Sequence, residues 1–391
     1  MNTRSDIVYL DYAATTPVDP RVVDVMTPLF GVDGDFGNPS SGHLSGRRSM
    51  QHVERAGGQL SELLGCTAAE LVWTSGATES DNLAIVGAAR YRADRGRHLV
   101  TMPTEHKAVS DVFQVLAKQG FEVTWLRPDE DGVLDPAELA AAIRPDTQLV
   151  SIMHVNNETG VIQDIEALGS VCRERDVLFH VDAAQSVGKL PIDLSALPVD
   201  LLSATAHKFY GPKGVGALYI ANRPGCHVEP LIHGGGQQGG RRPGTLAVPL
   251  IAGFGEAARI ARAEMQDDYA HLESLRTRLW SGIGDLEGIL RNGAESRSFP
   301  GILNVSIEDV EGESLLLALE PLCVATGSAC NSKSQAPSPV LRALGRSDLQ
   351  AQSAIRFSCG RPTTSAEVDF AVARYREAVG RLRGMAPSRV A

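Results

Sequence analysis

Residues 70–102, ELVWTSGATESDNLAIVGAARYRADRGRHLVTM, hold the pattern that decides the fold. An apolar run at 70–74 predicts a strand, the stretch 77–94 predicts a helix, and the run at 98–102 predicts a second strand. A strand, a helix and a strand of these lengths form a βαβ unit, whose two strands run parallel in one sheet. This stretch therefore indicates an α/β fold.

The same alternation continues as far as residue 220. A helix is predicted at 108–119, and further strands are predicted at 121–126, 148–154, 177–181, 201–204 and 216–220. Short apolar runs of this kind are typical of strands that are covered by helices on both faces. We expect a large domain built on a mainly parallel sheet.

The pattern changes after about residue 245. A long helix is predicted at 257–280, where two glycines in SGIG follow it, and a strand, a helix, a strand and an amphipathic helix are predicted at 302–307, 312–319, 354–357 and 366–382. These elements indicate a second, smaller α+β domain. We expect residues 17–262 to form the large domain, and residues 1–16 with 263–391 to form the small one.

Composition excludes several classes of protein. The chain has 391 residues, of which 43% are hydrophobic, so it can form two to three ordinary cores. Its net charge of −10 argues against a nucleic-acid binder and against docking on an anionic membrane. Six cysteines without C-x-x-C spacing argue against a disulfide scaffold or a metal site. With neither a secretory signal nor a run of ~18 apolar residues, we expect a cytoplasmic enzyme.

Three polar motifs follow predicted strands. The first is TSGATE at 74–79, where a glycine and small hydroxyl residues open a helix whose N–H groups could bind a phosphate. By itself this motif is more often an ordinary helix cap than a phosphate site. The second is HVDAAQ at 180–185, which places Asp182 at the end of an apolar strand, where a carboxylate needs a partner. That partner could be a cationic ring nitrogen, an arginine or a helix N-terminus.

The third motif, SATAHK at 203–208, places Lys208 after a strand and just before a Gly/Pro turn. A partly desolvated lysine has a lowered pKa and can form a Schiff base, although a surface lysine at a strand exit would have the same pattern. Together, a phosphate site, an aspartate for a pyridine nitrogen and a lysine for an aldehyde are what pyridoxal 5′-phosphate requires of a protein.

These motifs, with NNETG at 156–160 and AHKFYGPKG at 206–214, strongly resemble the class-V aminotransferase superfamily. The motif GSAC at 327–330, with IRFS at 355–358, resembles the cysteine desulfurases of the NifS and IscS type that have a long loop. The resemblance runs from YLDYAATTP at 9–17 to the final helix. It implies the pyridoxal-phosphate-dependent transferase fold, which is aspartate-aminotransferase-like, and conversion of L-cysteine to L-alanine.

The resemblance also implies a role for each matching residue. Lys208 carries the cofactor as a Schiff base, Asp182 pairs with the ring nitrogen, and Gln185 contacts the ring hydroxyl. His106 stacks on the ring and is the candidate for proton exchange with the substrate thiol. The phosphate ligands are Ala77, Thr78, Thr205 and His207, joined by Thr245 from the other subunit of a homodimer. Asn157, itself beside the cofactor, and Arg356 hold the substrate carboxylate.

Cys330 is implied as the residue that accepts sulfur from the substrate as a persulfide. The sulfur would then pass to an acceptor protein, either an iron–sulfur scaffold or a thiolation protein. A selenocysteine lyase or a plain class-V aminotransferase, in which Cys330 has no role, is the alternative. A sulfur carrier that keeps only the fold is disfavoured because the cofactor residues are present.

Two local features depart from expected patterns. Gly234–Gly239 satisfies G-x-G-x-x-G but leads into GRRP, which does not open a helix, so it fails as a dinucleotide motif. Gln238, Gly239, Pro243 and Ala206 differ from the residues usual in the family, near the expected cofactor and dimer contacts.

Overall fold

The large sheet predicted from the sequence is present in the computed structural model, which describes residues 7–326 and 337–385. It has seven strands in the order β2-β8-β7-β6-β5-β3-β4, and only β8 runs antiparallel to its neighbours. The strands are β2 (Leu71–Thr74), β3 (His98–Thr101), β4 (Glu122–Trp125), β5 (Thr147–Met153), β6 (Leu178–Asp182), β7 (Leu201–Thr205) and β8 (Gly216–Ile220). The α/β class with a mainly parallel sheet is confirmed.

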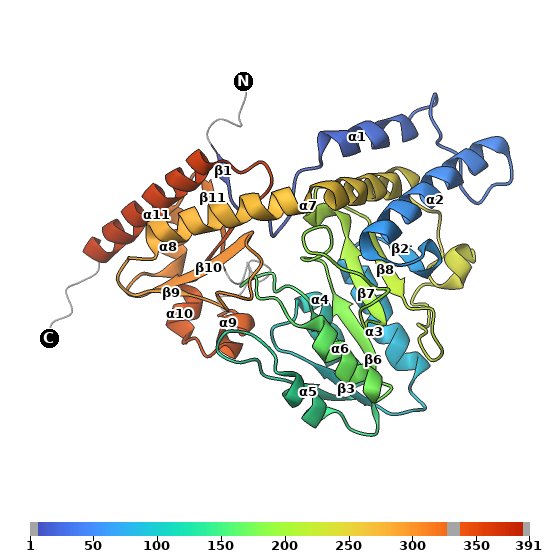
Figure 1. The fold of residues 1–391 in the computed structure, drawn as a ribbon, viewed down its shortest axis with the longest axis horizontal. Helices are drawn as coiled ribbons and strands as arrows, with labels where there is room; N and C mark the ends of the chain where they lie inside the picture. Colours follow the sequence, from blue (N-terminus) through green and yellow to red (C-terminus); the bar gives the residue numbers. More distant parts are fainter. Residues whose placement is uncertain (1–6, 327–336, 386–391) are drawn as a thin grey trace.

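Helices cover both faces of this sheet (Figure 1). Those of the large domain are α1 (Pro20–Met26), α2 (Leu44–Leu64), α3 (Ala77–Tyr91), α4 (Lys107–Lys118), α5 (Pro136–Ala142) and α6 (Ile165–Glu174). The helices predicted at 77–94 and 108–119 are α3 and α4, whose ends lie within three residues of the prediction. Helices α1, α2, α5 and α6 were not predicted.

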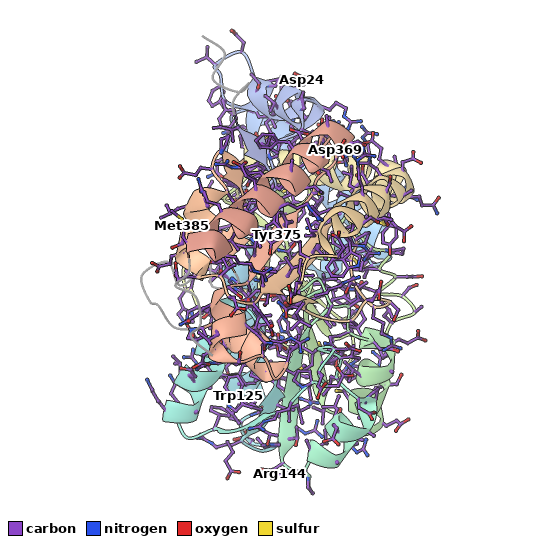
Figure 2. The ribbon with its side chains drawn as sticks, turned by 90° about the vertical axis from the view of Figure 1, so that its left-hand side faces the viewer. Asp24, Trp125, Arg144, Asp369, Tyr375 and Met385 are labelled. Atoms are coloured by element: carbon purple, nitrogen blue, oxygen red, sulfur yellow. The ribbon has the colours of Figure 1, made fainter. Side chains whose placement is uncertain are left out.

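A smaller body holds a four-stranded antiparallel sheet of order β12-β13-β10-β9. Its strands are β9 (Ile289–Arg291), β10 (Ile302–Ile307), β12 (Ala325–Thr326) and β13 (Ile355–Ser358). Its helices are α8 (Gly312–Ala318), α9 (Pro339–Ala343), α10 (Asp348–Gln352) and α11 (Ser365–Met385). The N-terminal strand β1 (Val8–Tyr9) pairs with β11 (Leu322–Cys323) of this body. Figure 2 shows α11 crossing its outer face between Asp369 and Met385.

Helix α7 (Val248–Ile283) connects the two bodies (Figure 1). Its buried residues up to Ala261 belong to the core of the large sheet, whereas those from Leu272 onward belong to the core under α11. The prediction of a helix at 257–280 was therefore too short at both ends. The passage from one core to the other agrees with the predicted boundary at residue 262, but the division into these two domains stays a prediction. No helix among the described residues could cross a membrane.

Candidate active site

A cavity of about 910 Å³ opens at the carboxyl ends of β5, β6 and β7. Met153, Asp182 and Thr205 are the last residues of these three parallel strands, and all three line the cavity. Open α/β sheets place ligand sites at this edge, because the chain leaves each strand there in a loop. The wall is completed by Pro339 and Val340 at the start of α9, so both bodies contribute to the cavity.

The structure brings ten of the predicted site residues into this one cavity. They come from six separate stretches of chain, spread over 280 positions, and are Ala77, Thr78, His106, Asn157, Asp182, Gln185, Thr205, His207, Lys208 and Arg356. No spacing rule in the sequence relates these stretches to one another. Their convergence is therefore a result of the fold.

The start of α3 is suited to bind an anion. Its N-cap is Gly76, so no side chain caps the first turn. The first two helical residues, Ala77 and Thr78, line the cavity at this helix N-terminus. A methyl group on Gly216 of β8 would lie 2.6 Å from the Gly76 carbonyl carbon. The position of this turn therefore depends on a glycine in the neighbouring strand.

Asp182 is buried at the end of β6, with 4% of its surface exposed. One of its oxygens, Oδ1, accepts a hydrogen bond from the Ala184 N–H at 2.9 Å. Burial raises the pKa of this carboxyl above its ordinary value, while that hydrogen bond and the nearby His106 and Lys208 offset part of the rise. The site thus holds a buried carboxyl close to the Lys208 amine.

Lys208 is held by backbone oxygens of the N-terminal segment. Its Nζ donates hydrogen bonds to the carbonyl oxygens of Ala13 at 2.5 Å and Ala14 at 2.9 Å. Gln185 Nε2 also donates to the Ala13 oxygen, at 2.7 Å. The amine of Lys208 is therefore fixed at the cavity wall beside the Gln185 amide.

His106 and His207 are placed by local contacts at the cavity wall. His106 caps α4, because its Nδ1 accepts the Ala108 N–H at 3.1 Å. His207 Nδ1 lies 3.1 Å from the Thr15 hydroxyl, and burial lowers the pKa of this imidazole to about 4. His207 is thus a neutral hydrogen-bonding group at neutral pH.

Arg356 reaches the cavity from β13 and joins the two bodies. One of its terminal nitrogens donates to the Asn157 carbonyl oxygen at 2.7 Å, and the other lies 2.6 Å from Asp11 Oδ1. Its Nε is buried and has no hydrogen-bond partner. Only 5% of this side chain is exposed, so its charge is held rigidly at the cavity wall.

One predicted residue, Thr245, does not line this cavity, and another, Cys330, cannot be placed in it or outside it. Thr245 is exposed and does not line it, so its assignment to the site of another subunit stays a prediction. Cys330 lies outside the described residues. Of the five cysteines within them, which are Cys66, Cys172, Cys226, Cys323 and Cys359, none lines the large cavity.

Comparison with known proteins assigns the family. The family model described as aminotransferase class-V matches residues 8–370. The chain belongs to the class-V aminotransferase family. Enzymes of this family use pyridoxal 5′-phosphate as their cofactor.

The chain is also similar to curated proteins named cysteine desulfurase IscS. Those from Klebsiella pneumoniae subsp. pneumoniae and Serratia proteamaculans are each 55% identical over 381 residues, covering 97% of this chain and 94% of the relative. A solved structure of a NifS-like protein is 38% identical, with a TM-score of 0.89 over 96% of this chain and all of that one. DndA from Streptomyces lividans is 42% identical, with a TM-score of 0.77 over 90% of this chain and 99% of that one. The pyridoxal-phosphate-dependent transferase fold is thereby confirmed.

The residues of this class-V chain fit pyridoxal phosphate. The uncapped start of α3 suits a phosphate, and the buried carboxyl of Asp182 suits a cationic ring nitrogen. Lys208, on the same cavity, has the amine needed for a Schiff base. Among the described residues, no cluster of side chains suits a metal ion.

Three acids near the site, two of them buried, were missed in the sequence. Asp81 and Glu105 are almost fully buried, and burial raises the pKa of each well above its ordinary value. Glu158 accepts a hydrogen bond from the Ser338 hydroxyl at 2.5 Å, and burial raises its pKa to about 7. All three line the large cavity. Their position in the sequence could have indicated them, because each of these acids lies in or next to a motif that the sequence analysis assigned to the site.

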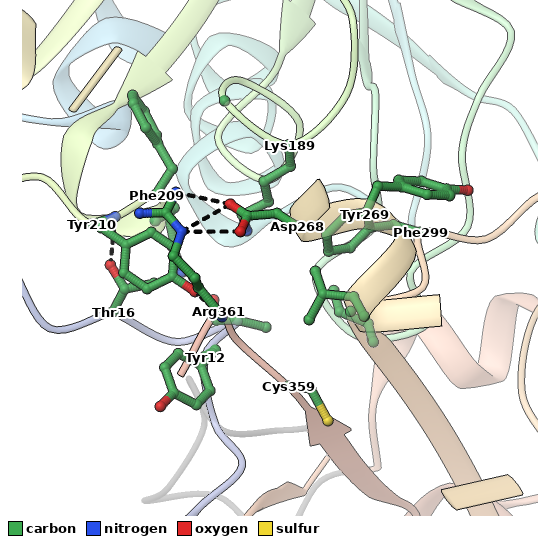
Figure 3. Close-up of a pocket in the computed structure, with 16 residues that line it drawn as sticks. Tyr12, Thr16, Lys189, Phe209, Tyr210, Asp268, Tyr269, Phe299, Cys359 and Arg361 are labelled. Atoms are coloured by element: carbon green, nitrogen blue, oxygen red, sulfur yellow. Dashed lines mark hydrogen bonds and ion pairs between the residues drawn. The ribbon is translucent and has the colours of Figure 1, made fainter. Parts of the chain in front are cut away.

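A second, small cavity of about 30 Å³ (Figure 3) is also lined by Lys208. Lys189 lines it and donates a hydrogen bond to Gln185 Oε1 at 2.8 Å. Arg361 also lines it and is paired with Asp268 at 2.8 Å. Cys359 is buried there, and burial raises the pKa of its thiol to about 12, so it is not a reactive thiolate.

Proposed function

We propose that the protein is a pyridoxal-phosphate-dependent cysteine desulfurase, which converts L-cysteine to L-alanine and passes the sulfur to Cys330. The observation that carries this proposal is the meeting of Lys208, Asp182, His106 and Arg356 in one cavity of a class-V chain. The high identity to proteins named cysteine desulfurase IscS supports it over the whole chain.

The substrate carboxylate binds beside Arg356 and Asn157. A guanidinium that is 95% buried holds its charge in a fixed direction, and a carboxylate is its best-matched partner. A solved relative that is 37% identical over 91% of this chain, SspA, was determined in complex with cysteine. We assign the same substrate to this chain.

The cofactor is held by Lys208, by Asp182 at its ring nitrogen and by Gln185 at its ring hydroxyl. Its phosphate is bound by Ala77, Thr78, Thr205 and His207, with Thr245 from the other subunit. When bound, pyridoxal phosphate supplies an electron sink that acidifies the Cα proton of the substrate. Asp182 sustains this by keeping the ring nitrogen protonated.

The proton transfers are carried out by residues of the chain. The Lys208 amine removes the substrate Cα proton. His106 exchanges a proton with the substrate thiol; since its Nδ1 accepts the Ala108 N–H, the exchanged proton is carried on Nε2.

The Cys330 thiolate attacks the substrate sulfur. A sulfur–sulfur bond forms while the carbon–sulfur bond of the substrate breaks, and the electron pair of that bond remains on the carbon, which takes up a proton. The products are alanine and a persulfide on Cys330, which a thiol of an acceptor protein can remove. We propose a homodimer located in the cytoplasm, whose acceptor is an iron–sulfur scaffold or a thiolation protein.

The test uses the purified holoenzyme with L-cysteine. Alanine should form in step with sulfide when a reducing thiol is present, and intact-mass analysis without that thiol should show one added sulfur on the peptide containing Cys330. Cys330→Ala should keep the cofactor absorbance but release no sulfide. Cys359→Ala is the matched control and should still gain sulfur.

Other results would favour the alternatives. Turnover of selenocysteine alone would identify a selenocysteine lyase, and transfer of the amino group to a keto acid would identify a plain aminotransferase. Undiminished sulfide release by Cys330→Ala would refute the role of Cys330.

A further inference from the structure

Asp81 is a buried acid that the proposed mechanism does not use. It lies on α3, which packs against β6 and β7 (Figure 1), and none of its surface is exposed. Neither carboxyl oxygen has a hydrogen-bond partner of normal geometry, although the Ser203 hydroxyl lies close enough to lower its pKa somewhat. Buried polar atoms are rarely left without partners, so this carboxyl needs an explanation.

The neighbours of Asp81 do not favour an ionised carboxylate. The nearest ring is that of His180, whose Nε2 lies 3.6 Å from Asp81 Oδ1. The two His180 nitrogens lie 2.8 Å from the Ser151 hydroxyl and 3.0 Å from the Ser203 hydroxyl. Burial lowers the pKa of His180 to about 3, so this ring is neutral at neutral pH.

The charged groups that act on Asp81 are both acidic. Asp182 lies on β6 two residues beyond His180, hence on the same face of the sheet, and Glu105 precedes α4. Ionisation of Asp81 would therefore place a negative charge without a cationic partner beside two other carboxyls, on a side chain with no exposed surface. Such a charge is costly, and the group keeps its proton instead.

Asp182 is also buried, and burial raises its pKa, but its partners differ from those of Asp81. It accepts a backbone hydrogen bond from Ala184, and that bond together with the nearby His106 and Lys208 favours its ionised form. Two neighbouring carboxyls whose environments differ in this way take different protonation states.

We propose that Asp81 is a positioning residue that remains protonated, so that the buried negative charge of the Asp81–Asp182 pair stays on Asp182, where the cofactor ring nitrogen binds. The functional part of this inference rests on the proposed cofactor site. The protonation state itself is a property of the chain without cofactor. It is therefore measured on the apoprotein.

The first test is infrared difference spectroscopy of the apoprotein at pH 7. Subtracting the spectrum of Asp81→Asn from that of the wild type should give the carbonyl stretch of a protonated carboxylic acid. Asp182→Asn, the matched control, should give the two stretches of a carboxylate. Carboxylate bands in the Asp81 spectrum would overturn the inference. If Asp81→Asn does not fold, Asp81→Ser serves the same subtraction.

The second test is the melting temperature of the apoprotein. An acid whose folded-state pKa lies above its unfolded value contributes its full stabilisation below that unfolded value, near 4, and loses it progressively as the pH rises toward the folded-state pKa. Wild-type stability should therefore fall between pH 4 and pH 7 more than that of Asp81→Asn, and the variant should gain in Tm relative to wild type over this range. A relative loss at pH 7 would contradict a protonated Asp81.

The third test is the affinity for pyridoxal phosphate, measured by fluorescence quenching. Asp81→Asn keeps a neutral polar group and should bind within about threefold of wild type, whereas Asp81→Glu, which pushes a longer acid toward Asp182, should bind at least tenfold more weakly. Equal losses in both variants would refute the positioning role. If the wild type bound no pyridoxal phosphate, the proposed function would fail, while the first two tests would still decide the state of Asp81.

Discussion

At the scale of single residues, the chemistry of this site depends on which buried groups are charged. Asp182 and Arg356 are both almost fully buried, yet each lies near a group of opposite charge: Lys208 near Asp182, and Asp11 beside Arg356. Truncating one partner of a buried charged pair is costly, because the other partner is left unpaired. Substitutions that keep shape and remove charge are therefore the informative ones.

Asp182→Asn keeps the shape of this side chain and removes its charge. We expect pyridoxal phosphate still to bind, because the phosphate site and Lys208 are intact. The rate of alanine formation should fall roughly a hundredfold or more, since the ring nitrogen loses its anionic partner. Steady-state kinetics with an absorbance spectrum of the holoenzyme measure both quantities. A kcat close to that of the wild type would disprove this role of Asp182.

Lys189 gives a pH dependence of stability. Burial, followed by the charges of Lys208 and Arg356, lowers its pKa to about 7, while an unfolded lysine titrates near 10.4. Between these values the unfolded chain binds more protons than the folded one, so stability rises with pH across this range. Lys189→Met should remove that rise.

The measurement is urea denaturation of the two apoproteins at pH 7, 8.5 and 9.5. The wild type should gain unfolding free energy relative to Lys189→Met as the pH increases. Parallel stability curves for the two proteins would show that Lys189 has an ordinary pKa.

At the scale of elements, close backbone contacts fix the position of the N-terminus of α3, where we propose that the phosphate binds. A methyl group on Gly216 would lie 2.6 Å from both Cα and the carbonyl carbon of Gly76, and 2.8 Å from the Ala204 oxygen. Gly216→Ala must therefore displace the turn that starts α3. Overpacking of this kind costs about 1–3 kcal/mol.

We expect Gly216→Ala to weaken binding of pyridoxal phosphate by roughly tenfold, while its far-ultraviolet circular dichroism stays that of the wild type. Gly57→Ala is the matched control. A methyl group there would lie 3.5 Å from the Ala68 side chain, an ordinary contact, in the middle of α2. Wild-type affinity in Gly216→Ala would show that the turn does not need this glycine.

The parts of the fold that the sequence predicts are the elements with strong apolar patterns. The β6 and β7 strands are buried along their whole length and were found within a residue or two. Helix α2 was missed because Gly57 and Gly58 interrupt its apolar pattern in the sequence. Its stripe of Val53, Ala56 and Leu60 is buried against α7, where a methyl group on Gly255 would lie 2.4 Å from the Ala56 Cα. Gly255 therefore allows the two helices to approach closely, which only the tertiary structure reveals.

The start of α7 was missed for a similar reason. Pro249 lies in its first turn, where proline is tolerated, and Gly253 and Gly255 follow within two turns. Packing against α1 and α2 compensates for these weak helix formers. Local propensity therefore predicted a later start than the one that tertiary contacts allow.

At the scale of the whole molecule, the site is assembled from parts that the sequence does not relate. The residues of the strand ends could be named in advance because each follows an apolar run. Asp81 and Glu105 could not, because their burial depends on α3 and the start of α4 meeting at one sheet edge. Nor could the half-buried Lys189, which lines the small cavity together with Tyr12 and Ala13 of the N-terminal segment. The Asp11–Arg356 ion pair shows the same dependence, since its members lie 345 positions apart.

The quaternary arrangement is open to a sharp test through Thr245. This residue lies three positions after Arg242, which forms an ion pair with Glu79 on α3 at 2.7 Å. Thr245 itself is exposed and does not line the cavity of its own chain. If it completes the phosphate site of a second subunit, Thr245→Ala should weaken cofactor binding by about tenfold, the value of one hydrogen bond to a charged group. Lys208→Ala, made separately, should abolish turnover.

Mixed dimers of these two variants then distinguish the possible arrangements. If Thr245 acts in the other subunit, the Lys208→Ala chain donates an intact Thr245 to the intact Lys208 of its partner, so one site of the mixed dimer is wild type. The other site carries both changes. We expect tandem-tagged mixed dimers to bind one equivalent of pyridoxal phosphate with wild-type affinity and to recover about half of the wild-type rate at limiting cofactor. If Thr245 acts within its own chain, every site in the mixed dimer is defective, and neither affinity nor rate should recover. Mixed dimers of Lys208→Ala with wild type provide the control, since they contain one intact site under either arrangement.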